Sequence, residues 1–86
     1  MLVLSRRVHE SIIVNEVIVV TVAAIPRAAV ELSLATIEGG ELSRLHLSKN
    51  ESAIIGSGVR VTLVEATTEK VRLGIELPPG VSISRR

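Results

Sequence analysis

Four arginines stand in pairs near the two ends of this 86-residue chain. Arg6 and Arg7 follow a short apolar run at the N-terminus, and Arg85 and Arg86 are the last two residues. A guanidinium group can form paired hydrogen bonds with a phosphate or with the edge of a guanine base. If the two ends meet in space, the four side chains form one basic patch. The alternative is that they only keep the chain soluble.

Other residues offer little catalytic or metal-binding chemistry. His9 and His46 each lack a second histidine, cysteine or aspartate at ligand spacing, so we expect no metal site. Glu10 and Glu51 could serve as paired carboxylates, but the internal repeat described below explains them better. The Gly-Ser-Gly run at 56–58 predicts a turn, because no helix and no Lys-Ser/Thr pair follow it as in a phosphate-binding loop. We therefore expect no enzyme activity and no cofactor.

The composition favours a small β protein. Hydrophobic residues make up 47% of the 86 residues, aromatic residues and cysteines are absent, and the net charge is +1. The core must be built from Val, Ile, Leu and Ala, and the β-branched residues among them favour strands. The length suits one domain, 1–86. No apolar run reaches the roughly 18 residues of a membrane span. We therefore expect a cytoplasmic chain with no membrane partner.

Strand-like segments follow one another along the whole chain, and none has a helical stripe of useful length. The alternation is clearest in residues 29–35, where Val30, Leu32 and Leu34 share one face. Glycines, prolines and polar residues separate the segments. The sequence therefore predicts an all-β fold with no significant helix and with strands over 2–7, 11–14, 17–24, 29–35, 42–48, 53–55, 59–65, 71–76 and 81–86.

The second half of the chain repeats the first. A shift of 41 residues superimposes Glu10–Arg44 on Glu51–Arg85, and 10 of these 35 positions are identical. Turn positions and the phase of the alternation also agree. We interpret the chain as an internal repeat of a five-strand module, with copies 1–44 and 45–86.

The first strand of the second copy follows a different shift in sequence. Residues 2–5 match residues 45–48 best, at a shift of 43. This match predicts that the second copy lacks two residues around Lys49 and Asn50. A loop tolerates such a deletion, so we place it between the first two strands of the copy.

Two motifs resemble the CsrA/RsmA carbon storage regulator family. The opening MLVLSRRV, with Glu10-Ser11-Ile12, resembles the start of the family, and VRLGIELP at 71–78 with VSISR at 81–85 resembles its fourth and fifth strands. The two copies together cover nearly the whole chain. The resemblance implies two interlocked antiparallel sheets built from two copies of the five-strand module and related by a pseudo-twofold axis.

The resemblance also implies a function. Family members are usually homodimers that bind GGA-containing loops in messenger leaders and regulate translation, without metal or catalysis. Each RNA site lies where the first strand of one subunit runs beside the fifth strand of the other. Carried over by position, the predicted RNA-binding residues are Leu4, Ser5, Arg6, Arg7, Leu77, Pro78, Val81, Ser82, Ile83, Ser84, Arg85 and Arg86.

The chain departs from the family pattern in three ways. Two copies share one polypeptide, the family's C-terminal helix is missing after the second copy, and it is missing after the first because Arg44 runs straight into Leu45. In addition, Arg86 stands where the family commonly has Glu. We favour a monomer that imitates the family's dimer, with a homodimer as the alternative. A small regulatory RNA or a protein antagonist would be further partners.

A second RNA site is predicted to be degenerate. Its residues would be Leu42, Arg44, Leu47, Ser48 and Lys49. Lys49 and Asn50 would take the places of Arg6 and Arg7. Parallel neighbours need a crossover connection, and no residue separates the two strands of this site, so we predict one continuous strand over 41–48 and one working site per chain. The alternative function is a protein-interaction module that has kept the fold and lost RNA binding.

Two further arginines, Arg60 and Arg72, interrupt otherwise apolar strands. Charged side chains are seldom buried without a partner, so we place both on the solvent face. The alternative is that they extend the basic patch.

Overall fold

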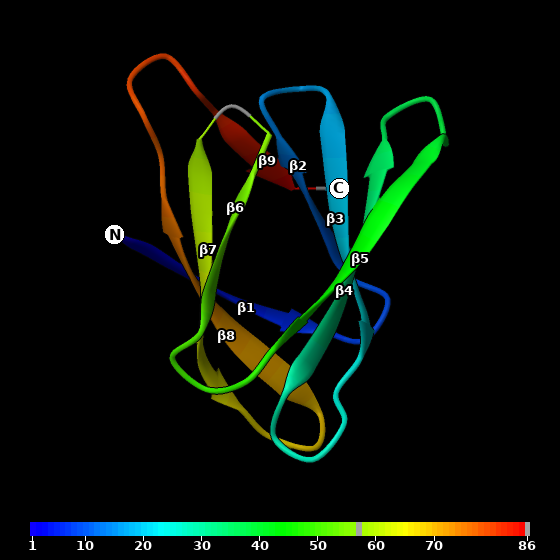
Figure 1. The fold of residues 1–86 in the computed structure, drawn as a ribbon, viewed down its shortest axis with the longest axis vertical. Helices are drawn as coiled ribbons and strands as arrows, with labels where there is room; N and C mark the ends of the chain where they lie inside the picture. Colours follow the sequence, from blue (N-terminus) through cyan, green and yellow to red (C-terminus); the bar gives the residue numbers. More distant parts are fainter. Residues whose placement is uncertain (57, 86) are drawn as a thin grey trace.

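The computed structural model describes residues 1–56 and 58–85. Ser57 of the predicted turn and Arg86 of the predicted RNA site lie outside the described residues. The described part consists of strands and turns and contains no helix (Figure 1). The strands are β1 (Leu2–Arg7), β2 (Ser11–Val14), β3 (Ile18–Ala24), β4 (Val30–Thr36), β5 (Glu41–Leu47), β6 (Ser52–Ile55), β7 (Val59–Ala66), β8 (Lys70–Glu76) and β9 (Ile83–Arg85).

The strands form two antiparallel sheets. The order is β1-β8-β7-β6 in the first, here called sheet A, and β5-β4-β3-β2-β9 in the second, sheet B. Each sheet includes one strand from the opposite end of the chain. In sheet A the first strand, β1, pairs with β8, and in sheet B the last strand, β9, pairs with β2. Figure 1 shows β1 beside β8 and β5 leading from one sheet into β6 of the other. The predicted all-β fold with two interlocked sheets is confirmed.

The two sheets bury one core of aliphatic side chains. On β4 the predicted face of Val30, Leu32 and Leu34 is buried, and its intervening residues are partly exposed. Each such side chain stabilises the fold by about 1.5–3 kcal/mol on full burial. The largest fully buried side chains are Ile12, Leu32, Leu63, Leu73, Ile75, Val14, Val22, Val30, Val59, Val61 and Val71.

Structural details recur at the spacing of 41 residues seen in the sequence. The hydroxyls of Ser11 and Thr21 lie 2.7 Å apart, and those of Ser52 and Thr62 lie 2.6 Å apart. The irregularity between β3 and β4 recurs at the equivalent place between β7 and β8. By this spacing β1 to β4 correspond to β5 to β8, and residues 42–44, which correspond to β9, lie within β5.

The turn before the second strand of each copy shows that the predicted shift of 43 residues is wrong. The Arg7 N–H donates to Glu10 Oε1 over 2.7 Å, and the Ser48 N–H donates to Glu51 Oε1 over the same distance. These turns are 41 residues apart, so no residues are missing around Lys49-Asn50. A slip of two residues leaves every side chain on the same face of a strand. The alternation of leucines therefore could not reveal the error.

Strand β5 takes the place in sheet B that β1 takes in sheet A. It runs without a break from Glu41 to Leu47, which confirms the predicted continuous strand. Leu47 lies opposite Val30 of β4, as Arg6 lies opposite Val71 of β8. β5 is paired with β4 along its whole length and does not pair with β6. In the described part of the chain β6 therefore has β7 as its only strand neighbour.

Candidate nucleic-acid interface

Two arginines from opposite ends of the chain meet at one pocket. Arg6 on β1 and Arg85 on β9 line this open pocket of about 120 Å³ together with Glu10 and Ser11. Strand β1 is an edge of sheet A and β9 is an edge of sheet B. The pocket therefore lies where two sheet edges approach each other, and each edge has backbone groups on its unpaired side.

Backbone carbonyls hold the Arg6 guanidinium in place. Its Nη1 donates to the Ser5 carbonyl over 2.6 Å, and its Nε donates to the Ser11 carbonyl over 3.4 Å. Its Nη2 is buried and finds no hydrogen-bond acceptor among the described residues. Leaving a buried donor unpaired costs about 1–3 kcal/mol. An acceptor oxygen or nitrogen of a ligand would satisfy this donor.

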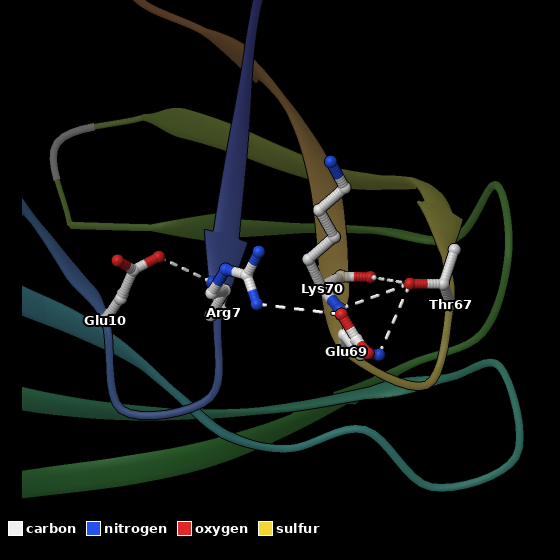
Figure 2. A network of polar contacts seen from close by, with 5 residues as sticks. All are labelled: Arg7, Glu10, Thr67, Glu69 and Lys70. Atoms are coloured by element: carbon white, nitrogen blue, oxygen red, sulfur yellow. Dashed lines mark hydrogen bonds and ion pairs between the residues drawn. The ribbon is translucent and has the colours of Figure 1, made fainter.

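Figure 2 shows Arg7 between two carboxylates. Its backbone N–H donates to Glu10, while its guanidinium Nη1 lies 3.6 Å from Glu69 Oε2. Both partners of the ion pair are well exposed. Such surface pairs contribute at most about 1 kcal/mol. A phosphate can therefore compete with Glu69 for this guanidinium.

The pairing of β1 with β8 adds two cations beside the predicted site. Lys70 lies opposite Arg7, and Arg72 lies opposite Ser5. Both cations are exposed, as is Arg60, so the predicted solvent face of Arg60 and Arg72 is confirmed. The predicted strand over 71–76 leaves Lys70 out, whereas β8 begins at this residue. Its place beside the site follows from the cross-strand register of β1 on β8, which no local pattern in the sequence reveals.

The remaining predicted residues of the last strand follow its alternation. Val81 and Ile83 are partly buried against the core, whereas Ser82 and Ser84 are exposed. The Ser82 carbonyl accepts a hydrogen bond of 2.7 Å from the Asn15 N–H, which ties the segment to the end of β2. The exposed serine hydroxyls are therefore presented on a backbone that the fold holds in place.

Leu77 and Pro78 lie away from the arginines. Leu77 lines a second pocket with Met1 and Leu2, beside the beginning of β1. The five steps from Leu2 to Arg7 span about 16 Å of strand. Leu4 and Ser5 stand between these ends on β1, with Leu4 partly buried and Ser5 exposed. The predicted residues of β1 thus extend from the pocket of Leu77 to the pocket of Arg6 rather than forming a single cluster.

The predicted places of Lys49 and Asn50 in a second site are wrong. The 41-residue spacing puts Leu47 where Arg6 stands and Ser48 where Arg7 stands. Leu47 is only 4% exposed and belongs to the core. The second copy therefore carries no cation at either position.

The remaining residues of the degenerate site lie on the continuous strand β5 or in the turn that follows it. Arg44 is opposite Ser33 of β4 and lies 3.8 Å from Glu41, whereas Arg85 is opposite Ile12 of β2. Leu42 and Arg44 share the exposed face of β5, and Leu47 points into the core from the other face. Lys49 lies in the following turn and is exposed.

Metal ligands and membrane-spanning helices are not found in the described part. In residues 1–56 and 58–85 the His and Glu side chains nowhere gather in a group of three that could hold a metal ion. His9 and His46 are exposed, one in a turn and one on β5. Likewise, residues 1–56 and 58–85 include no helix with the length and apolar character needed to cross a membrane.

The model of CsrA, described as a global regulator protein family, matches residues 1–37 and 42–86. The chain belongs to this family. The two matched segments begin 41 residues apart, the spacing that the hydrogen bonds also follow. The predicted resemblance to CsrA is therefore confirmed.

A relative from Rhodopirellula baltica carries the name Translational regulator CsrA. It is 43% identical over 42 residues, which are 49% of this chain and 60% of that relative. The aligned region thus spans less than two thirds of the relative's length. No solved structure matches the chain.

Proposed function

We propose that this chain is an RNA-binding regulator of translation that recognises GGA-containing loops in messenger leaders. The observation that carries the proposal is the pocket where Arg6 and Arg85 meet. Family membership and the name of the Rhodopirellula relative support a regulatory role. The RNA-binding residues that we propose are Leu4, Ser5, Arg6, Arg7, Leu77, Pro78, Val81, Ser82, Ile83, Ser84, Arg85 and Arg86.

The chemistry of the site suits an unpaired loop. Arg6 and Arg85 can donate to the O6 and N7 atoms of guanine, and Arg6 Nη2 has no acceptor among the described residues. Arg7 on β1, with Lys70 and Arg72 on the neighbouring strand β8, can neutralise phosphates. Unpaired bases are where proteins usually read RNA sequence. Because the chain has no aromatic residues, recognition rests on guanidinium groups and strand-edge backbone rather than on stacking.

The repeat explains why we propose one principal site per chain. Copies 1–44 and 45–86 meet inside β5, so the single chain imitates a dimer within one domain. The first composite site needs β9, and in the described part β6 has no equivalent strand beside it. A small regulatory RNA with the same loop, or an acidic protein antagonist, would compete at the composite site. We place the chain in the cytoplasm, where messengers are translated.

Binding of a GGA hairpin, compared with a hairpin of scrambled loop sequence, tests the function. The decisive variants are Arg85→Ala and its counterpart in the repeat, Arg44→Ala, which removes an equally charged side chain. We expect Arg85→Ala to weaken GGA binding by about 1–3 kcal/mol, as for removal of a hydrogen-bonded base partner. Arg44→Ala should bind like the unmodified chain. Equal binding of both hairpins, or equal weakening in both variants, would overturn the assignment.

A further inference from the structure

One edge of strand β6 is open, whereas the equivalent edge of β2, its counterpart in the repeat, is paired with another strand. β2 lies between β3 and β9, and Ile13 is opposite Ser84 of β9. β6 has the same relation to β7 that β2 has to β3, with Ile54 in the place of Ile13. Within the described residues no strand lies on the other side of β6. One position in the sheet is therefore open.

The hydrogen bonds identify which backbone groups face this opening. The Leu63 N–H donates to the Glu51 carbonyl over 3.0 Å, so residue 51 points toward β7. Successive residues of an antiparallel strand direct their backbone groups to alternate sides. The N–H and C=O groups of Ser52 and Ile54 therefore point away from β7. On β2 the equivalent side is paired with β9. Just beyond β2, the Asn15 N–H donates to the Ser82 carbonyl over 2.7 Å on the same side.

The sequence of β6 has none of the residues that usually protect an open edge. Charged side chains and prolines discourage pairing between exposed edges. The other edge strands of the described sheets each carry charge: two arginines in β1, Glu41 and Arg44 in β5, and Arg85 in β9. β6 reads Ser-Ala-Ile-Ile and carries none. Its Ile54 side chain is 57% exposed, whereas Ile13 is partly buried.

We propose that β6 pairs antiparallel with β6 of a second copy of this chain. Every copy has the same free edge, so pairing about a twofold axis satisfies both edges at once. Pairing of β9 from one copy with β6 of another would not do this, because β9 would then leave the edge of its own β2 unpaired. The dimer joins two A sheets into one continuous sheet. With only four residues in β6, the interface is small, and interfaces below about 1,200 Å² are typically transient.

The dimer has a consequence for RNA binding, and this consequence alone rests on the proposed function. Each chain supplies one composite site, so a pair of chains carries two. The dimer would thus hold two GGA loops at once, although the fused chain itself offers a single complete site. Self-association through β6 needs no RNA and can be measured without it.

Sedimentation equilibrium over a concentration series tests the proposal. We expect the mass to rise from that of one chain, 9.2 kDa, toward twice this value, and we expect Ile54→Lys to remain at the mass of one chain. Leu42→Lys is the matched control, because Leu42 is 54% exposed but lies on the charged edge strand β5. It should associate like the unmodified chain. A single-chain mass at every concentration, or equal behaviour of the two variants, would overturn the proposal.

Hydrogen exchange on the unmodified chain provides a test that does not depend on a variant. The Ile54 amide faces the open edge, so it should exchange rapidly in dilute solution and slow at least tenfold when the chain is concentrated. The Ala53 amide faces β7 and should remain protected at both concentrations. An Ile54 amide with the same exchange rate at both concentrations would overturn the β6 interface. Hairpin binding by Ile54→Lys, measured at low concentration, should match the unmodified chain, which separates this proposal from the proposed function.

Discussion

Arg6 and Leu47 occupy equivalent places on β1 and β5, yet one belongs to a solvent-open pocket and the other to the core. Arg6 lies opposite Val71, and Leu47 lies opposite Val30. The same backbone position therefore carries a pocket-lining cation in one half of the chain and a packing residue in the other. This difference makes the pseudo-twofold arrangement chemically unequal.

Replacing Arg6 with leucine should separate stability from binding. Arg6→Leu copies the side chain of the equivalent position and removes the buried Nη2, which has no acceptor in residues 1–56 and 58–85. We expect the free energy of unfolding to rise by about 1 kcal/mol and binding of a GGA hairpin to fall by about 1–3 kcal/mol. Urea unfolding and hairpin titration measure the two effects. A variant with lower stability and unchanged binding would contradict the assigned role of Arg6.

Lys70 should contribute to affinity without reading sequence. Lys70→Ala should weaken GGA and scrambled hairpins by the same factor, because a phosphate carries no base information. The slope of log K against log salt should become shallower by about 0.7, the change expected when one phosphate of a single strand is no longer neutralised. Titrations at several salt concentrations test this. A selective weakening for the GGA loop would instead mean that Lys70 contacts a base.

Removing the carboxylate of Glu69 should strengthen RNA binding. Glu69 competes with phosphate for Arg7, from which it is separated by 3.6 Å. Glu69→Gln should raise hairpin affinity several-fold at low salt, while the stability of the chain changes by less than about 1 kcal/mol. The gain should shrink as added salt screens the charges. Weaker binding by this variant would show that Glu69 supports the site rather than competing with its ligand.

The turn at His9 offers a test of the repeat itself. His9 has a φ of 75° and its counterpart Asn50 a φ of 69°, both in the left-handed region. Asparagine adopts this region more readily than most residues with a side chain. His9→Asn should therefore raise the free energy of unfolding by up to about 1 kcal/mol, and Asn50→His should lower it by a similar amount. Thermal or urea unfolding of both variants measures this. A loss of stability in His9→Asn, or a gain in Asn50→His, would contradict the equivalence of the two turns.

The sequence predicted the strands well because their local patterns are strong. Period-two alternation marked β4 and β8, and glycines or prolines marked the turns on both sides of β4, between β6 and β7, and after β8. The absence of helix followed from the β-branched composition. The meeting of Arg6 and Arg85 at one pocket required a resemblance to a known family, because no local pattern connects the two ends of a chain.

Register and edge occupancy were harder to predict. A slip of two residues leaves the faces of a strand unchanged, so the leucines of β5 matched β1 at the wrong shift. The hydrogen bonds from Ser48 to Glu51 and from Arg7 to Glu10 fix the true one. The cation Lys70 enters the site only through the pairing of β1 with β8. Such cross-strand relations depend on the folded sheets rather than on neighbouring residues in the chain.

The central claim is that one composite site per chain binds RNA, and calorimetric titration with a GGA hairpin tests it most directly. The claim predicts a stoichiometry of one hairpin per chain and a loss of tight binding in Arg6→Leu. Two equivalent hairpins per chain, or unchanged affinity of Arg6→Leu for the hairpin, would contradict it.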